Sequence, residues 1–315
     1  MSNRGVNALK YFDILEAKKA YDEGSNITAL LREQKNTKDN TSEIIEIAYD
    51  LQAGKYTEFA EQNKSYLSRY AEEISGLIQD HITPNDTLLD VGTGESTTLS
   101  FLVQRLATKP LHVFAFDISW SRIYKGIAFA SKNMGDCFSR FTPFVGDISE
   151  TPLLDKSINV TISNHALEPN GGRLPELLSE IFRVTRDKVI LFEPCYEINT
   201  DEGKKRMDRL GYIKGVDFVV EALGGKLIEK IEIKNAINAL NPTVCFVIEP
   251  PSQTEAQTSH LDPLNIFSVP GTNHSLEKVD DFFFSNTTGL CFPILKSIPV
   301  LKSNAVILST ALSTT

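Results

Sequence analysis

The run LLDVGTGE at residues 88–95 has the residue types needed to bind a nucleoside ligand. An apolar stretch is followed by an acidic residue and two glycines one residue apart, which is typical of a strand, a tight turn and a helix. Glycines let the backbone approach a ligand closely, and the helix N-terminus offers free N–H groups. The carboxylate of Asp90 would repel a pyrophosphate and favour a cationic amine. The run therefore predicts a nucleoside ligand that carries a positive group.

Two further carboxylates end strand-like runs later in the chain. Asp117 lies 23 residues after Gly94, close to the spacing of about 20 expected for a ribose contact in a strand–helix–strand unit. The carboxylate of Asp147 suits an adenine amino group, and the N–H of Ile148 suits a ring nitrogen. In an open α/β sheet, ligands bind beyond the carboxyl ends of the strands. We therefore expect Asp90, Asp117 and Asp147 to border one binding site.

The elements that must position these residues alternate between strand and helix over residues 87–194. This alternation predicts a doubly wound parallel sheet, with strands at 87–91, 112–117, 141–147, 158–163 and 188–193, and helices at 96–106, 119–133 and 175–184. Residues 216–223 indicate another helix, and residues 226–233 and 243–248 two late strands. The connection between these two strands is too short for a crossover helix with its turns. We therefore expect the late strands to be antiparallel.

The length of 315 residues suits about two domains. The predicted fold class is α/β, a doubly wound seven-stranded Rossmann-like sheet with an antiparallel last strand, an N-terminal helical extension and a small C-terminal β-rich domain. The corresponding boundaries are 1–80 for the helical region, 81–250 for the sheet domain, 251–263 for a linker and 264–315 for the small domain. Core or surface packing is the preferred interpretation of Tyr49 and Tyr56, and covering of the ligand is the alternative.

Composition and charge limit the partners and the location. The net charge of 32 − 41 = −9 argues against broad electrostatic binding to nucleic acid or to an anionic lipid surface. No apolar run approaches the ~20 residues of a membrane span, and residues 1–10 lack the apolar core of a signal peptide. The four cysteines lie far apart, which favours reduced, buried thiols over a disulfide or a metal site. A cytoplasmic protein is the expectation.

Four motifs together resemble the class I S-adenosylmethionine-dependent methyltransferases. They are LDVGTGE at 89–95, AFDIS at 115–119, VGDI at 145–148 and SNHALE at 163–168, and the resemblance covers about residues 85–250. It implies S-adenosyl-L-methionine as the cofactor, with the motifs contacting in turn the methionine moiety, the ribose, the adenine and the neighbourhood of the methyl group. Ser96 stands where the family usually has a third glycine. A dinucleotide oxidoreductase, the rival interpretation, needs a glycine there and gives no reason for Asp90.

The resemblance assigns a set of cofactor-binding residues and no metal. The set comprises Asp90, Gly92, Thr93, Gly94, Glu95, Asp117, Ile118, Ser119, Asp147, Ile148, Asn164 and His165. Each element alone is also compatible with a structural turn or a helix cap. The order of all four motifs along one chain is what favours the cofactor site.

Three residues are candidates for catalysis: His165, Glu168 and Glu193. Methyl transfer from a sulfonium needs an in-line nucleophile, and holding the two reactants in line supplies much of the rate. A hydroxyl acceptor also gains from a general base, and His165 is the preferred candidate because its unperturbed pKa lies near neutrality. The alternative, that His165 only shapes the pocket, stays open. For Glu168 and Glu193, the alternatives are a plain connection and a solvated cap.

Residues 267–302 resemble a small zinc-ribbon-like domain of the tRNA-methyltransferase activator type. That domain carries four thiolates, and the corresponding positions here are Val269, Thr272, Ser285 and Thr288. None of these side chains supplies a thiolate, so zinc is not expected there. The resemblance then implies an apolar module for docking or self-association.

The preferred hypothesis is a methyltransferase acting on a hydroxyl (or amine) of a small-molecule or carbohydrate-type acceptor. The HALEPNGG segment at 165–172 and the N-terminal helices resemble bacterial methyltransferases of surface-glycan or secondary-metabolite pathways. One alternative is a methyltransferase that acts on RNA or a translation-related protein through the C-terminal domain. The other is a non-catalytic, methyltransferase-like binding subunit.

Overall fold

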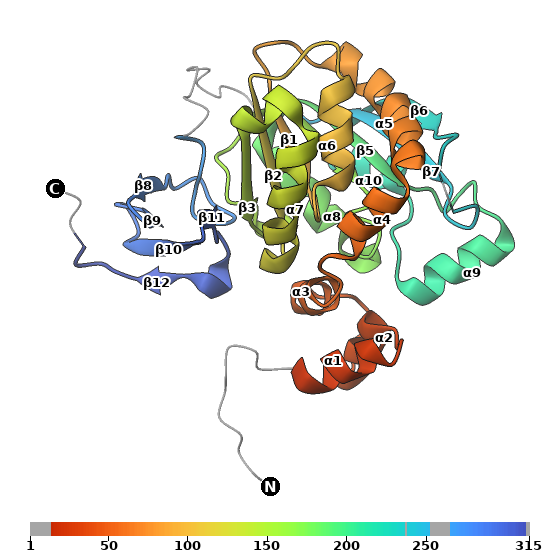
Figure 1. Ribbon diagram of the computed structural model, residues 1–315, viewed down its shortest axis with the longest axis horizontal. Coiled ribbons are helices and arrows are strands. Elements are labelled where there is room, and N and C mark those ends of the chain that lie inside the picture. Colours follow the sequence, from red (N-terminus) through yellow and green to blue (C-terminus); the bar gives the residue numbers. More distant parts are fainter. Residues whose placement is uncertain (1–13, 237, 253–264, 313–315) are drawn as a thin grey trace, which may run out of the picture.

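A computed structural model describes residues 14–236, 238–252 and 265–312. Its centre is a seven-stranded sheet in the order β3-β2-β1-β4-β5-β7-β6 (Figure 1). The strands are β1 (Thr87–Val91), β2 (His112–Asp117), β3 (Phe141–Val145), β4 (Ile158–Asn164), β5 (Thr185–Pro194), β6 (Lys226–Glu232) and β7 (Thr243–Glu249). Strands β1 to β5 are parallel, and β7 runs antiparallel to both β5 and β6. The predicted doubly wound sheet and its antiparallel late pair are confirmed.

Helices cover both faces of the sheet because its parallel strands are apolar on both sides. On β1, Leu88 packs with α5 (Lys64–Ile78), α6 (Thr97–Arg105) and α7 (Trp120–Asn133). The next residue, Leu89, packs on the opposite face with α8 (Leu174–Val184) and α10 (Val216–Ala222). This alternation follows from the two-residue period of a strand. The sheet is thereby held rigid, with its carboxyl edge left for a site.

Several elements differ from their predicted bounds by one to three residues; strand β5, for example, begins at Thr185 and not at residue 188. Two of these differences have a clear local cause. Strand β3 ends at Val145 and not at residue 147, because Asp147 begins the short 3-10 helix η3 (Ile148–Glu150). The Asp147 carboxylate accepts a hydrogen bond from the backbone N–H of Ser149 at 2.9 Å. Similarly, Ser119 is the N-cap of α7, and its hydroxyl accepts from the N–H of Arg122. Polar side chains that cap a helix take the cap residue out of the helix itself.

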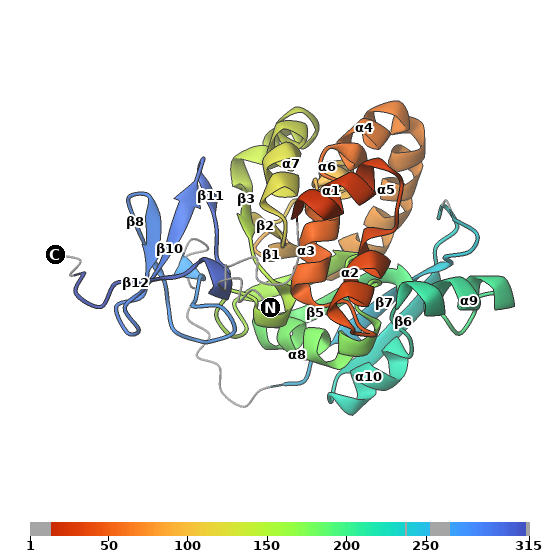
Figure 2. The ribbon, with the colours of Figure 1, turned by 90° about the horizontal axis from the view of Figure 1, so that it is seen from below.

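The N-terminal helices form a small unit with its own core, at one end of the main domain (Figures 1 and 2). They are α1 (Ile14–Asp22), α2 (Ile27–Lys35) and α3 (Ser42–Asp50). The next helix, α4 (Lys55–Gln62), packs instead through Ala60 against α5 and α7. Arg32 joins this unit to α9 (Asp201–Leu210) by donating to the carbonyls of Arg209 and Leu210, both at 3.2 Å. An arginine at a helix C-terminus satisfies carbonyls that have no partner within the helix. The contact holds α2 against the main domain.

The C-terminal segment folds into a small antiparallel sheet that packs against the outer edge of the main sheet (Figure 1). Its strands are β8 (Glu277–Val279), β9 (Phe282–Phe284), β10 (Leu290–Leu295), β11 (Ile298–Pro299) and β12 (Ile307–Leu308). Leu301 donates its N–H to the carbonyl of Val145 at 2.9 Å, and the Phe267 ring lies 5.2 Å from the Phe144 ring. The two parts therefore share one apolar core. Residues 253–263 of the predicted linker, and residue 264 of the predicted small domain, lie outside the described residues.

Two bulk features accompany this fold. Among the described residues, no helix has both the length and the apolar character needed to cross a membrane. All four cysteines are free and buried. They pack inside the fold as small side chains, and the Cys195 thiol also donates to the Glu197 carboxylate at 3.3 Å.

Candidate active site

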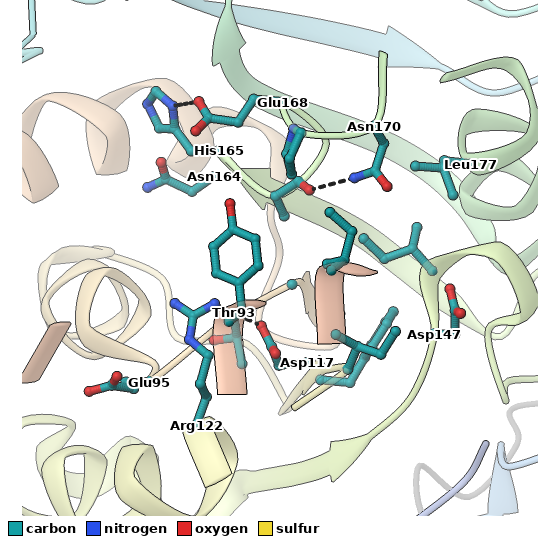
Figure 3. Close-up of a pocket in the computed structure, with 18 of the residues that line it drawn as sticks. Thr93, Glu95, Asp117, Arg122, Asp147, Asn164, His165, Glu168, Asn170 and Leu177 are labelled. Carbon is teal, nitrogen blue, oxygen red and sulfur yellow. Dashed lines mark hydrogen bonds and ion pairs between the residues drawn. The ribbon is translucent and has the colours of Figure 1, made fainter. Parts of the chain in front are cut away.

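A pocket of about 150 Å³ opens at the carboxyl ends of β1, β2 and β4 (Figure 3). The predicted cofactor residues that line it are Gly92, Thr93, Glu95, Asp117, Ile118, Asp147, Ile148, Asn164 and His165. Glu168 lines it as well. Asp90, Gly94, Ser119 and Glu193 lie outside this lining. The structure thus brings together residues that are up to 76 positions apart in the sequence (168 − 92 = 76).

The loop after β1 needs its glycines. Gly92 and Gly94 have φ of 66° and 59°, which is a left-handed region that favours glycine. A Cβ atom on Gly92 would lie 2.3 Å from the Cβ atom of Ala166, so the loop also approaches the end of β4 closely. Ser96, which replaces the family's usual third glycine, adopts φ of 52° at the N-cap of α6. The turn is therefore kept without that glycine.

Asp117 ties the glycine loop to the end of β2. Its side chain is buried, and its carboxylate accepts hydrogen bonds from the N–H of Gly94 at 3.0 Å and of Ser119 at 2.9 Å. The guanidinium of Arg122 lies 3.4 Å from the same carboxylate. A carboxylate has about four lone-pair sites, so it can also accept from a pair of ribose hydroxyls. Its position on the pocket wall matches that role.

Asp90 lies behind the loop and is only 5% exposed. Burial raises the pKa of its carboxyl to about 7; the charge of Asp117 adds to this, and a hydrogen bond with Thr93 opposes it. Near neutral pH such a carboxyl is partly protonated, and a nearby cation favours its ionised form. Asp90 lies outside the pocket lining, and its hydrogen bond with Thr93 connects it to the glycine loop.

Glu95 lines the pocket, but both oxygens of its carboxylate serve helix α4. One accepts from the N–H of Gly54 and the other from the N–H of Thr57, each at 2.8 Å. A carboxylate at a helix N-terminus satisfies free N–H groups and interacts favourably with the helix dipole. The side chain thereby places α4, and with it Tyr56, over the pocket.

Two buried donors in the pocket have no partner within the described residues. They are Nε of Arg122 and Nδ2 of Asn164. The Arg122 guanidinium lies between the rings of Tyr49 and Tyr56, with its Cζ atom 5.1 and 4.6 Å from the ring centres. The Oδ1 atom of Asn164 accepts from the hydroxyl of Tyr70 at 3.1 Å. Because buried donors in proteins are nearly always paired, these two fit a ligand that supplies acceptor oxygens.

His165 and Glu168 form an ion pair at the end of β4, with 2.8 Å between Nδ1 and Oε2 (Figure 3). Burial alone would lower the pKa of His165, but the hydrogen bond and the charge of Glu168 outweigh it and raise that pKa above its usual value. Glu168 also accepts from Asn241 at 3.1 Å, and Nε2 of His165 contacts the Thr243 hydroxyl at 3.1 Å. A carboxylate that holds one nitrogen of a histidine fixes the tautomer and makes the other nitrogen a stronger base.

Glu193 lies beneath the turn that carries this pair. Its Oε1 atom accepts from the Ser163 hydroxyl at 2.7 Å and from the N–H groups of Ala166 and Leu167, and its Oε2 atom accepts from the N–H of Glu168 at 3.0 Å. The side chain is fully buried, which raises its pKa to about 7. The turn needs this support because His165 itself has φ of 58°.

Comparison with known families gives this site its context. Residues 82–264 match a family described as "Methyltransferase domain". The chain belongs to this methyltransferase family. A search of curated proteins found no match.

Two solved structures share the fold of this methyltransferase at low sequence identity. One is a Haloferax volcanii complex between a methyltransferase activator and a methyltransferase, with 16% identity, a TM-score of 0.50, and 65% of this chain and 99% of that chain covered. The other is magnesium protoporphyrin IX methyltransferase from Synechocystis PCC 6803 with bound SAH, with 11% identity and the same TM-score and coverage. Both similarities concern the fold alone.

Sequence reasoning missed the contacts that close the pocket of the methyltransferase. Asp50, at the end of α3, accepts from the Ser119 hydroxyl at 2.6 Å and from the Ser121 hydroxyl at 3.1 Å. Lys302 donates to Glu46 of α3 at 2.5 Å and to the carbonyl of Ile118 at 3.4 Å. These pairs join segments up to 256 positions apart. No local pattern marks such pairs, since each residue alone reads as an ordinary surface charge.

Proposed function

We propose that the protein transfers a methyl group to a hydroxyl (or amine) of a small-molecule or carbohydrate-type acceptor. The cofactor is S-adenosyl-L-methionine. The observation that carries the proposal is the buried Asp117 carboxylate, which borders the pocket beside a loop whose Gly92 admits no side chain. The two buried donors without partners, on Arg122 and Asn164, support a ligand that brings carboxylate or hydroxyl oxygens.

Each part of the pocket has a proposed partner on the cofactor. The loop of Gly92 and Gly94 holds the methionine moiety, and Asp117 holds the ribose hydroxyls. Asp147 and Ile148 border the adenine, and Nδ2 of Asn164 donates to the methionine carboxylate. When bound, the cofactor supplies an electrophilic methyl group on a sulfonium. Positioning then provides most of the rate, because the acceptor needs only to be held in line.

The proposed base is His165, with Glu168 as its partner. Glu168 holds the Nδ1 proton, so Nε2 carries the lone pair. In the protein without acceptor this nitrogen contacts the Thr243 hydroxyl at 3.1 Å, and an acceptor hydroxyl must replace that contact to give its proton to Nε2. Glu193 has a positioning role, since its four hydrogen bonds keep the turn of residues 163–168 in place. Glu95 likewise positions the lid helix α4.

For the C-terminal segment we retain docking or self-association as the proposed role. Thr272 donates its N–H to the Val269 carbonyl at 3.0 Å, and Gly289 to the Ser285 carbonyl at 2.8 Å, so the zinc-ribbon resemblance falls on two tight turns. Neither turn carries a thiolate. Ile307 and Leu308 are 54% and 72% exposed, and large exposed apolar side chains favour a partner contact.

Calorimetry tests the function directly. Titration with S-adenosylmethionine should show one site per chain, and S-adenosylhomocysteine should compete for it. Transfer of a labelled methyl group to a panel of hydroxylated metabolites then separates an enzyme from a binding subunit. Absence of binding to both compounds would refute the proposal.

A further inference from the structure

A second cavity, of about 280 Å³, lies next to the cofactor pocket. Its walls come from the N-terminal helices, from the turn at Pro169 and from the segment that follows α9. Tyr49 and Pro169 line both cavities. The two cavities are therefore neighbours that share part of their walls.

None of the described residues that line this cavity is a lysine, arginine, aspartate or glutamate. The lining instead has the phenol rings of Tyr21, Tyr49 and Tyr212, together with amide, hydroxyl and apolar side chains. A phosphate or carboxylate buried there would lack a cation, which is costly. Ring faces and neutral hydroxyl groups, by contrast, match aromatic side chains and amides.

Two arginines lie near the cavity, and both are committed elsewhere. The guanidinium of Arg32 donates to Asn40 and to two carbonyls at the end of α9. Arg206 donates to Asn241 at 3.4 Å while its guanidinium covers the Tyr212 ring. Neither is part of the lining. Neither arginine is therefore left unpaired to bind an anionic group in the cavity.

Tyr212 connects this cavity to the proposed base. Its hydroxyl is hydrogen-bonded to Glu168, which in turn holds Nδ1 of His165. An acceptor that contacts Tyr212 is thus separated from His165 by one hydrogen-bonded side chain, that of Glu168. The amide of Gln52 lies in the same wall, and its side chain makes no hydrogen bond within the described residues.

We propose that this cavity binds the methyl acceptor, and that the acceptor is a neutral, hydroxylated ring without phosphate or carboxylate groups. The proposal rests on the proposed function. The acceptor oxygen bonds to the methyl carbon as the carbon–sulfur bond breaks, the electron pair stays on sulfur, and the hydroxyl proton passes to Nε2 of His165. Gln52, Tyr21 and Tyr212 line this cavity and not the cofactor pocket, so they select the acceptor and leave cofactor binding unaffected.

The test uses the full chain saturated with S-adenosylhomocysteine and a panel of neutral glycosides and phenols, each beside its phosphate ester. Binding is followed by saturation-transfer NMR, which needs no turnover. We expect neutral rings to bind and their phosphate esters to give no signal, with the glycoside and phenol arms showing which ring is accepted. Gln52→Ala should weaken acceptor binding about tenfold, as expected for one lost hydrogen bond. Gln62→Ala, on the exposed side of α4, is the matched control.

Three results would overturn the proposal. They are equal binding of the phosphate esters, no binding of any neutral ring, and identical affinities of the Gln52→Ala and Gln62→Ala variants. Calorimetry with S-adenosylmethionine on the same variants separates the two proposals. A protein that binds neutral rings through Gln52 but binds no cofactor would refute the proposed function, and the cavity would then be a site for neutral rings that are not methyl acceptors.

Discussion

The guanidinium of Arg122 lies 3.4 Å from the carboxylate of Asp117, between the rings of two tyrosines from the N-terminal helices. Asp117, which is expected to hold the ribose, thus contacts a guanidinium that is covered by Tyr49 and Tyr56. Arg122 therefore links the packing of Tyr49 and Tyr56 to the position of the Asp117 carboxylate. A ligand that bonds to Asp117 competes with, or rearranges, this contact.

Replacement of Arg122 by methionine should destabilise the protein. Removing one partner of a buried ion pair leaves the other charge uncompensated, and we expect the free energy of unfolding to fall by about 3 kcal/mol. Urea denaturation measures the change. The double variant Arg122→Met/Asp117→Asn should recover part of the loss, since the remaining side chain is neutral. Purely additive losses would show that the two residues are not coupled.

Asp117→Ala should weaken binding of S-adenosylmethionine. Loss of two buried ribose hydrogen bonds corresponds to about 1–3 kcal/mol, which calorimetry resolves easily. Asp136→Ala, an exposed aspartate after α7, is the control and should bind as the wild type does. An unchanged affinity of Asp117→Ala would remove the ribose assignment.

Binding of S-adenosylmethionine should strengthen as pH rises through about 7. Burial gives Asp90 a pKa of about 7, so near neutrality a fraction of the protein carries the neutral acid. A cationic ligand favours the carboxylate, hence binding releases a proton and affinity grows with pH. Calorimetry in buffers of different ionisation enthalpy measures the number of protons that are released on binding. Asp90→Asn should abolish the proton release, and a release that persists would point to another group.

Methyl transfer should follow the ionisation of His165. Glu168 raises the pKa of the imidazole above its usual value, so the rate should rise with pH through a value above 6.5. Glu168→Gln removes the charge that raises this pKa, and the rise should then occur at lower pH. His165→Gln should lower kcat while the Kd of the cofactor stays the same. If His165→Gln retains full turnover, the histidine only shapes the pocket.

The sheet was predictable because its strands carry strong local signals. Strand β2 was predicted with both of its ends, and the antiparallel late pair followed from the length of one connection. Helix α9 was missed since only Gly203 and Met207 of its ten residues are buried, which leaves no apolar stripe to detect. Its position depends instead on a distant arginine, Arg32.

The site was predictable in its motifs but not in its contacts. The spacing of Asp117 from Gly94 placed both at one edge, where they are hydrogen-bonded. The cation of Arg122 in the pocket could not be foreseen, because its side chain direction depends on rings contributed by Tyr49 and Tyr56. The same holds for Glu193, which accepts from the Ser163 hydroxyl of β4 and from three N–H groups of the turn that follows β4. Polar contacts between distant segments depend on the tertiary structure, so local sequence patterns do not predict them.

The contact between Lys302 and Glu46 has a consequence for synthesis of the chain. Glu46 leaves the ribosome 256 residues before its cationic partner, at a time when no part of the main sheet has yet been made. Until Lys302 emerges, α3 has a carboxylate that resists burial, and burial is what raises the pKa of Glu46 in the finished fold. A nascent chain can therefore assemble its sheet early, yet the pocket acquires its complete cover only when the C-terminal segment is delivered.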